Sequence, residues 1–189
     1  MRKAQRIGED CVLECNREKS CPHGGHINSE DSASQRVRLV VDVTSDELRG
    51  YLSSVIDDYN PAAQTSLGIR GYANKLTQQG RTIAAVSDSP GTGEIVGILA
   101  GYFNNPEQGF SFVSAFHVRL PFRRMHIGVM LMDKAVEISR GAGFGTLRLK
   151  VDKANGIGIA FYERYGFAAI GEDTRQIEMA YDLKRGGND

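Results

Sequence analysis

The chain has 189 residues, 41% of them hydrophobic, and its 23 Lys and Arg residues balance its 23 Asp and Glu residues. That length predicts one domain of ordinary size, and the hydrophobic fraction allows a sizeable core. A formal net charge of zero argues against binding by bulk positive charge, so we expect neither nucleic acid nor a membrane as a partner.

Targeting signals and membrane spans are not visible in the sequence. No apolar run approaches the roughly 18 residues of a transmembrane helix, and the longest one, residues 95–103, reads as a buried strand. The N-terminus has no apolar segment behind its basic residues, so we expect a cytoplasmic protein.

Residues 1–36 are polar and lack apolar periodicity, which predicts a flexible N-terminal extension. This stretch holds the potential zinc ligands Cys11, Cys15, Cys21, His23 and His26. Their spacing matches no common zinc finger, so we favour free thiols and expect no metal site.

The folded domain is expected to begin with a strand over residues 37–43. Thr44-Ser-Asp-Glu47 has the pattern of a capping box, and an apolar stripe reaching Tyr59 predicts a helix that Asn60-Pro61 ends. A second helix is expected over residues 67–79, with Gly80 as its stop.

The remaining elements follow from alternation, helical spacing and turn residues. We expect strands at 81–87, 94–103 and 110–118, a helix at 127–140, a strand at 146–152, a short helix between Asn155 and Gly166, and strands at 168–170 and 177–183. Gly- and Pro-containing turns make the first three of these strands an antiparallel meander, whereas the helix at 127–140 makes strand 146–152 parallel to strand 110–118.

The link between strand 110–118 and the next helix is short and basic. Arg123, Arg124 and His126 precede the helix N-terminus, where the helix dipole disfavours positive charge. A surface arginine pair is one reading; the other is that a bound anion, such as a phosphate, occupies the helix start.

Two segments resemble the GNAT superfamily of acyl-CoA-dependent N-acetyltransferases. Val118-Arg-Leu-Pro-Phe-Arg-Arg-Met-His-Ile-Gly128 is similar to that family's phosphate loop, built around R/Q-x-x-G-x-G/A, although Arg124 and His126 stand where glycine is common. Asn155-Gly-Ile-Gly-Ile-Ala-Phe-Tyr-Glu-Arg-Tyr-Gly-Phe167 is similar to its N-x-x-A-x-x-x-Y-x-x-x-G-F motif, with Gly158 in place of the usual alanine.

The resemblance covers residues 37–185 and leaves a C-terminal tail at 186–189. It implies an α/β (α+β) fold: a mixed, mostly antiparallel sheet of six to seven strands, with a central splayed parallel pair and flanking helices. It also implies acetyl-CoA as co-substrate. The residues implied in binding it are Phe116, His117 and Val118 along the pantetheine arm, Arg123, Arg124, Met125, His126, Ile127, Gly128 and Val129 at the pyrophosphate, and Asn155.

The resemblance implies Tyr162 as the general acid that protonates the departing thiolate; its alternative is a core aromatic. The general base stays open, because residues 110–118 contain no carboxylate. His117, Glu94, Glu107 and a water chain are candidates, although a strand-end histidine ordinarily faces solvent. The Val118 N–H is a candidate oxyanion donor, and the lack of a recognisable nucleophile favours direct transfer.

The expected function is therefore transfer of an acetyl group from acetyl-CoA to a primary amine of a small molecule. Two alternatives stay open: a non-catalytic acyl-CoA-binding sensor or partner domain, and a protein N-terminal or lysine acetyltransferase. A homodimer also stays open, since the sequence does not set the oligomeric state.

Overall fold

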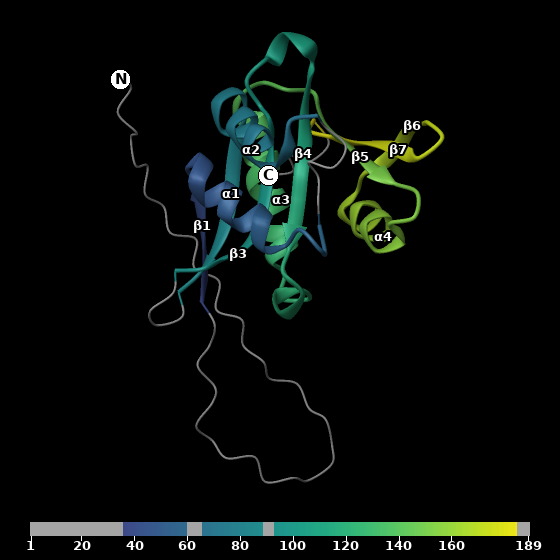
Figure 1. Ribbon diagram of the computed structural model, residues 1–189. Helices are drawn as coiled ribbons and strands as arrows, with labels where there is room; N and C mark the ends of the chain where they lie inside the picture. Colours follow the sequence, from purple (N-terminus) through teal and green to yellow (C-terminus); the bar gives the residue numbers. More distant parts are fainter. Residues whose placement is uncertain (1–35, 60–65, 89–92, 185–189) are drawn as a thin grey trace, which may run out of the picture.

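A computed structural model describes residues 36–59, 66–88 and 93–184 (Figure 1). Its elements in chain order are β1 (Val37–Val41), α1 (Ser45–Ser54), α2 (Gly68–Gln79), β2 (Arg81–Ser87), β3 (Ile95–Tyr102), η2 (Pro106–Gln108), β4 (Phe110–Val118), η3 (Leu120–Phe122), α3 (Ile127–Gly141), β5 (Thr146–Asp152), α4 (Gly156–Tyr165), β6 (Ala168–Glu172) and β7 (Gln176–Asp182). The cysteines and histidines considered as zinc ligands lie outside the described residues.

The strands form one seven-stranded sheet in the order β1-β2-β3-β4-β5-β7-β6. β1 to β4 are an antiparallel meander, β4 and β5 are the parallel pair, and β7 joins β5 and β6 antiparallel. This is the mixed sheet with a parallel central pair that the sequence predicted.

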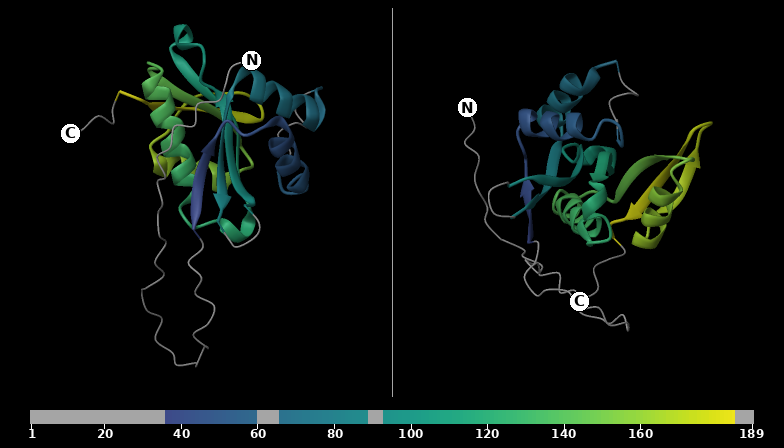
Figure 2. Two further views of the ribbon diagram at one scale, coloured as in Figure 1. Left: turned by 90° about the vertical axis from the view of Figure 1, so that its left-hand side faces the viewer. Right: turned by 60° about the horizontal axis from the view of Figure 1, so that its bottom comes forward.

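Helices cover both faces of the meander, so its inner strands are buried on both sides. Along β2, Ile83 and Ala85 pack in a cluster with Leu131 of α3, whereas Ala84 packs in a second cluster with Leu48 of α1. Figure 2 shows α1 and α2 on one side of these strands and α3 on the other. The near-continuous apolar run of β2 follows from burial on both faces.

The parallel pair separates along its length. β4 and β5 pair only over Phe110–Val113 and Thr146–Leu149. Beyond that point β5, β7, β6 and α4 swing away from the meander (Figures 1 and 2). The second half of β4, residues 114–118, therefore has β3 on one side and, within the described parts of the chain, no strand on the other.

One predicted boundary is wrong in a way that matters for the site. The capping box of Thr44 and Glu47 starts α1 as expected, but α1 ends at Ser54 instead of continuing to Asn60. The Asp58 and Tyr59 N–H groups both donate to the Val55 carbonyl, at 3.0 and 2.7 Å, in a turn. The apolar spacing predicted a helix beyond Val55, but Ile56, which belongs to that spacing, is exposed. The turn carries Asp58 and Tyr59 towards β4.

Candidate active site

The open half of β4 carries backbone groups that point away from β3. Arg119 donates its N–H to Val96 of the β3 side at 2.9 Å, so by strand alternation residues 116 and 118 face the other way. The Phe116 N–H accordingly donates to the Tyr59 hydroxyl at 2.9 Å, and the Val118 carbonyl accepts from Arg123 Nε at 2.9 Å. An extended ligand can pair with this edge as an additional strand would.

The loop that follows β4 presents a run of free backbone N–H groups. None of the N–H groups of residues 124–129 donates to an acceptor in the part of the chain that the structure describes. Arg124 and His126 have φ of 67° and 58°, so left-handed residues alternate with their neighbours. Such alternation turns successive N–H groups inward and creates an anion-binding concavity, here at the start of a 15-residue helix.

This geometry explains the two departures from the family's loop. Arg124 and His126 keep the left-handed conformation that glycine adopts more easily. Their exposed side chains leave the backbone N–H groups open. The loop thus has the shape of an anion cradle without glycine at positions 124 and 126.

Three other residues predicted to bind the cofactor, Met125, Ile127 and Gly128, take part in packing. Ile127 is buried in the core, and Met125 packs against it. Gly128 lies where a Cβ would come within 3.3 Å of the Phe116 ring and 3.4 Å of Phe161. A larger residue there would crowd the helix against those rings.

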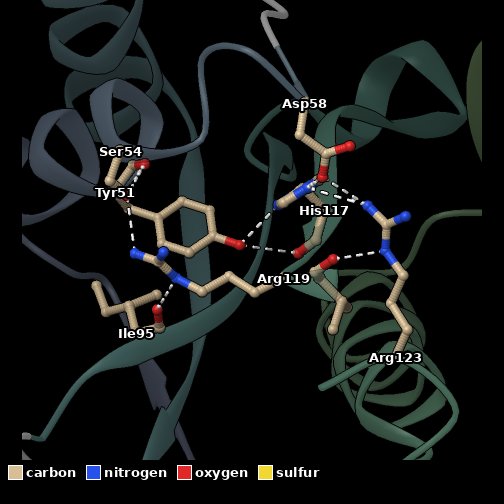
Figure 3. A network of polar contacts seen from close by, with 8 residues as sticks. Tyr51, Ser54, Asp58, Ile95, His117, Arg119 and Arg123 are labelled. Carbon is tan, nitrogen blue, oxygen red and sulfur yellow. Dashed lines mark hydrogen bonds and ion pairs between the residues drawn. The ribbon is translucent and has the colours of Figure 1, made fainter. Parts of the chain in front are cut away.

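The guanidinium of Arg123 does not point to the start of α3. Its guanidinium bonds the Asp58 carboxylate at 2.8 Å and the Val118 carbonyl at 2.9 Å (Figure 3). Its backbone N–H donates to Leu120. The structure therefore brings Arg123 to the α1 side of β4.

α4 positions Tyr162, the predicted general acid. Asn155 caps the helix by accepting from the Gly158 N–H at 2.9 Å, and a Cβ on Gly158 would come within 2.6 Å of the Asn155 amide. Glycine in place of the usual alanine thus makes room for this cap. The Asn155 Oδ1 is thus engaged in capping the helix.

Tyr162 is buried, and its ring centroid lies 6.0 Å from that of Phe116 on the open part of β4. Its hydroxyl has no hydrogen-bond partner among residues 36–59, 66–88 and 93–184. Burial raises the pKa of Tyr162 well above its usual range, so the hydroxyl stays protonated at neutral pH.

His117 departs from the sequence expectation of a solvent-facing side chain. It is 6% exposed and lies on the α1 face of β4. Its Nε2 is 2.9 Å from the Asp58 carboxylate, its Nδ1 is 2.8 Å from the Tyr51 hydroxyl, and the Tyr59 ring stacks on it at 4.9 Å (Figure 3). Strand alternation sends this side chain inward because the face above β4 is covered by α1 and the turn after it.

The charges of this pair are set by their contacts. The hydrogen bond from His117 lowers the pKa of Asp58, with Arg123 acting in the same direction. Burial lowers the pKa of His117, and the bond to Asp58 only partly opposes it. At neutral pH Asp58 is therefore a carboxylate and His117 is a neutral imidazole.

The other two candidate bases lie elsewhere. Glu94 pairs with Arg119 at 3.3 Å. Glu107 is in η2, before the start of β4, at the opposite end of that strand from His117.

Asp58 belongs to the region 57–75 that the family resemblance places beside the acceptor, but the charges of that region, Asp57, Asp58, Arg70 and Lys75, are mixed and did not single it out. The helix predicted to run to Asn60 gave no reason to expect Asp58 at β4.

The described residues contain no group of three or more His, Cys, Asp and Glu side chains that could hold a metal ion. None of the helices seen in the structure is long and apolar enough to cross a bilayer.

A strand edge left open beside a cradle of backbone N–H groups defines a site for an extended ligand with a polyphosphate end. The sequence profile of the acetyltransferase (GNAT) family matches residues 51–167, which contain both features. The chain therefore belongs to the GNAT acetyltransferase family, whose members are acyl-CoA-dependent N-acetyltransferases with acetyl-CoA as co-substrate.

Solved structures show the same fold. Nourseothricin acetyltransferase is 26% identical, with a TM-score of 0.52 over 56% of this chain and 66% of that one. A GNAT acetyltransferase from Staphylococcus aureus Mu50 is 15% identical, with a TM-score of 0.62 over 78% of this chain and 99% of that one.

A protein from Bacillus anthracis str. Ames, assigned as a streptothricin acetyltransferase and solved in complex with acetyl coenzyme A, is 16% identical, with a TM-score of 0.50 over 58% of this chain and 67% of that one. No curated protein matches the sequence.

Proposed function

We propose that the protein transfers an acetyl group from acetyl-CoA directly to a primary amine of a small molecule. The observation that carries this proposal is the open edge of β4 at residues 114–118, which ends at the N–H cradle of residues 124–129. An extended pantetheine arm fits the edge, and the pyrophosphate fits the cradle.

In this proposal the chain's residues have distinct roles. The Phe116 and Val118 backbones hold the arm, and the loop N–H groups hold the pyrophosphate without depending on side-chain identity. The N–H groups on the β4 edge also stabilise the oxyanion of the tetrahedral intermediate. Tyr162, protonated and without a hydrogen-bond partner in the described parts of the chain, donates its proton to the departing thiolate, and the tyrosinate takes back the proton that the attacking nitrogen loses as the amide forms.

A small amine is supported by the side of β4 that faces α1. There the Asp58 carboxylate lies beside a neutral imidazole. His117 and Arg123 both bond its Oδ2, so its Oδ1 is the oxygen that can accept from a cationic amine. The similarity to nourseothricin acetyltransferase favours an amine-bearing antibiotic among the small molecules to be tested.

The test has two stages. Calorimetric titration with acetyl-CoA, and with an acetyl-pantetheine fragment lacking the pyrophosphate, measures how much the cradle contributes to binding. Release of CoA thiol is then measured with a panel of spermidine, lysine, glucosamine and nourseothricin, and with a peptide bearing a free N-terminus and a lysine. Tight binding without thiol release from any amine would refute the transferase proposal and favour a sensor, whereas release with the peptide alone would refute the small-molecule assignment.

A further inference from the structure

Side chains of the protein itself occupy part of the open edge of β4. The Val118 carbonyl accepts from Arg123 Nε at 2.9 Å. The Phe116 N–H donates to the Tyr59 hydroxyl, also at 2.9 Å. Between these two contacts, the Val118 N–H and the Phe116 carbonyl have no partner in the described parts of the chain. The free part of the edge is therefore one donor and one acceptor, and it ends at the Tyr59 hydroxyl.

This order indicates where a bound thioester would lie. The cradle of residues 124–129 follows the Val118 end of the edge, so a pantetheine arm that starts at the cradle extends back towards Phe116. The amides of the arm supply the carbonyl and the N–H that the two free backbone groups need. The thioester follows the last amide after a short methylene link, which brings it to the Tyr59 hydroxyl.

The Tyr59 hydroxyl has a hydrogen that it can donate. Its oxygen accepts from the Phe116 N–H, but no group among residues 36–59, 66–88 and 93–184 accepts from its O–H. Burial raises the pKa of Tyr59 well above its usual range, so the hydroxyl is protonated at neutral pH. A hydroxyl that accepts one hydrogen bond is polarised and becomes a stronger donor in the next. Tyr59 therefore offers a hydrogen bond to a ligand atom.

The Tyr59 ring is held in position by its neighbours. Its backbone N–H donates to the Val55 carbonyl at 2.7 Å, in the turn after α1. The ring stacks on that of His117, with a centroid distance of 4.9 Å and an interplanar angle of 15°. His117 is itself bonded to Asp58 at 2.9 Å and to Tyr51 at 2.8 Å (Figure 3). A donor that is fixed before the reaction needs no reorganisation when charge develops on its acceptor.

We propose that the Tyr59 hydroxyl donates to the carbonyl oxygen of the bound thioester and stabilises the oxyanion of the tetrahedral intermediate. This role rests on the proposed function, and it adds a catalytic side chain to the backbone N–H groups of the β4 edge. His117 is a positioning residue in this arrangement, because it acts by supporting the Tyr59 ring.

The step leaves the proton of Tyr59 on its oxygen. The amine nitrogen forms a bond to the carbonyl carbon, and an electron pair of the C=O bond moves onto the oxygen that accepts the Tyr59 hydrogen bond. When the intermediate collapses, the C=O bond forms again and the C–S bond breaks, with its electron pair leaving on sulfur. Because an oxyanion is a stronger acceptor than a neutral thioester oxygen, Tyr59 contributes to the rate more than to acetyl-CoA binding.

The first test separates rate from affinity. Tyr59→Phe keeps the ring that stacks on His117 and removes only the hydroxyl. Loss of one oxyanion donor costs about 100-fold or more, and the freed Phe116 N–H replaces part of it, so kcat for CoA release with the best amine of the panel should fall about 10-fold. The affinity for acetyl-CoA, measured by calorimetry, should not weaken.

Tyr72→Phe is the matched control on the same strand. The Tyr72 hydroxyl donates to the Ser114 carbonyl at 2.9 Å, so its hydrogen is used within the protein. Because this bond is the same in the ground state and the transition state, kcat should change by no more than about 3-fold. A fall in kcat for Tyr59→Phe no larger than that for Tyr72→Phe would refute the role of Tyr59.

Two analogues of acetyl-CoA test the same role without turnover. Carboxymethyl-CoA carries an anionic oxygen close to the sulfur, whereas ethyl-CoA carries no oxygen there. Since a hydrogen bond to a charged oxygen is stronger than one to a neutral group, Tyr59→Phe should lose about 10-fold in affinity for carboxymethyl-CoA relative to ethyl-CoA. Calorimetric titration of both proteins with both analogues measures this difference.

Equal changes in the two affinities would refute the role of Tyr59 while leaving the transferase intact. Wild-type protein that releases no CoA thiol with any amine of the panel would instead refute the proposed function, and this role with it.

Discussion

The site at the end of β4 has two sides that are built from different parts of the chain. The cofactor side consists of backbone: the strand edge at residues 114–118 and the N–H groups of residues 124–129. The acceptor side consists of side chains, Tyr51, Asp58 and His117, that come from two distant segments. The contrast teaches that the cofactor side tolerates unusual residues as long as the backbone conformation is kept, whereas the acceptor side depends on residue identity.

The largest effect is expected at Tyr162, the α4 side chain that packs near Phe116 beside the cofactor side. Tyr162→Phe should lower kcat by about 100-fold, because it removes the proton donor for the thiolate. The acetyl-CoA dissociation constant should stay within about 2-fold, since the Tyr162 hydroxyl bonds nothing in the described chain that positions the loop. Steady-state kinetics and calorimetry measure the two quantities. An unchanged kcat would remove Tyr162 from the mechanism.

A proline in the first turn of α3 tests whether the cradle works through backbone. Val129→Pro deletes one N–H at a position where helices accept proline, and a hydrogen bond to a charged phosphate is worth about 1.5–3 kcal/mol. We therefore expect at least about 10-fold weaker acetyl-CoA binding by calorimetry. Val129→Ala is the control and should bind normally. Equal behaviour of the two variants would contradict a backbone cradle.

Tyr59 marks the point where the two sides meet. Its hydroxyl occupies the Phe116 N–H that the acyl-CoA arm would use. Because Tyr59→Phe frees this N–H and a hydrogen bond contributes about 1 kcal/mol net, acetyl-CoA should bind up to about 5-fold more tightly. Tyr102→Phe, a control away from this edge, should leave the affinity unchanged. Weaker binding in Tyr59→Phe would show that this hydroxyl helps to hold the ligand.

The smallest effect concerns the pH dependence of stability on the acceptor side. Burial lowers the pKa of His117 in the folded protein, so below the ordinary value of 6.5 the unfolded chain binds more protons there. Its contribution is fully present above about pH 6.5 and is lost as the pH falls towards the lowered value. Thermal melts over this range should fall more steeply for the wild type than for His117→Asn. A wild-type curve no steeper than that of the variant would show that His117 is not held neutral by the fold.

Most of the fold could be read from local patterns. The strands of the meander, α3 and the parallel strand β5 follow from alternation and helical spacing, and the capping box at Thr44 marks the start of α1. The end of α1 could not be read in this way. The apolar spacing runs on past Ser54, but the chain turns at Val55, which packs in the same cluster as Ala115 of β4.

The cofactor side of the site was also visible in the sequence, because the strand, the basic loop and the helix are contiguous. Even so, Arg123 was assigned to the phosphate by its charge, and the structure shows its guanidinium bonded to Asp58 and Val118. The acceptor side left no comparable signal, since Tyr51, Asp58 and His117 belong to no motif and have separations that carry no periodicity.

By itself the sequence determined the order of elements, the parallel pair and the family, and it singled out the strand-loop-helix segment that we propose meets the cofactor. These depend on hydrogen bonding and apolar spacing between residues that are near in the chain. The tertiary structure alone decided that Asp58 lies 2.9 Å from His117, a partner 59 residues away. That contact exists because α1 stops early and packs over the open half of β4, and no local preference of either residue encodes it.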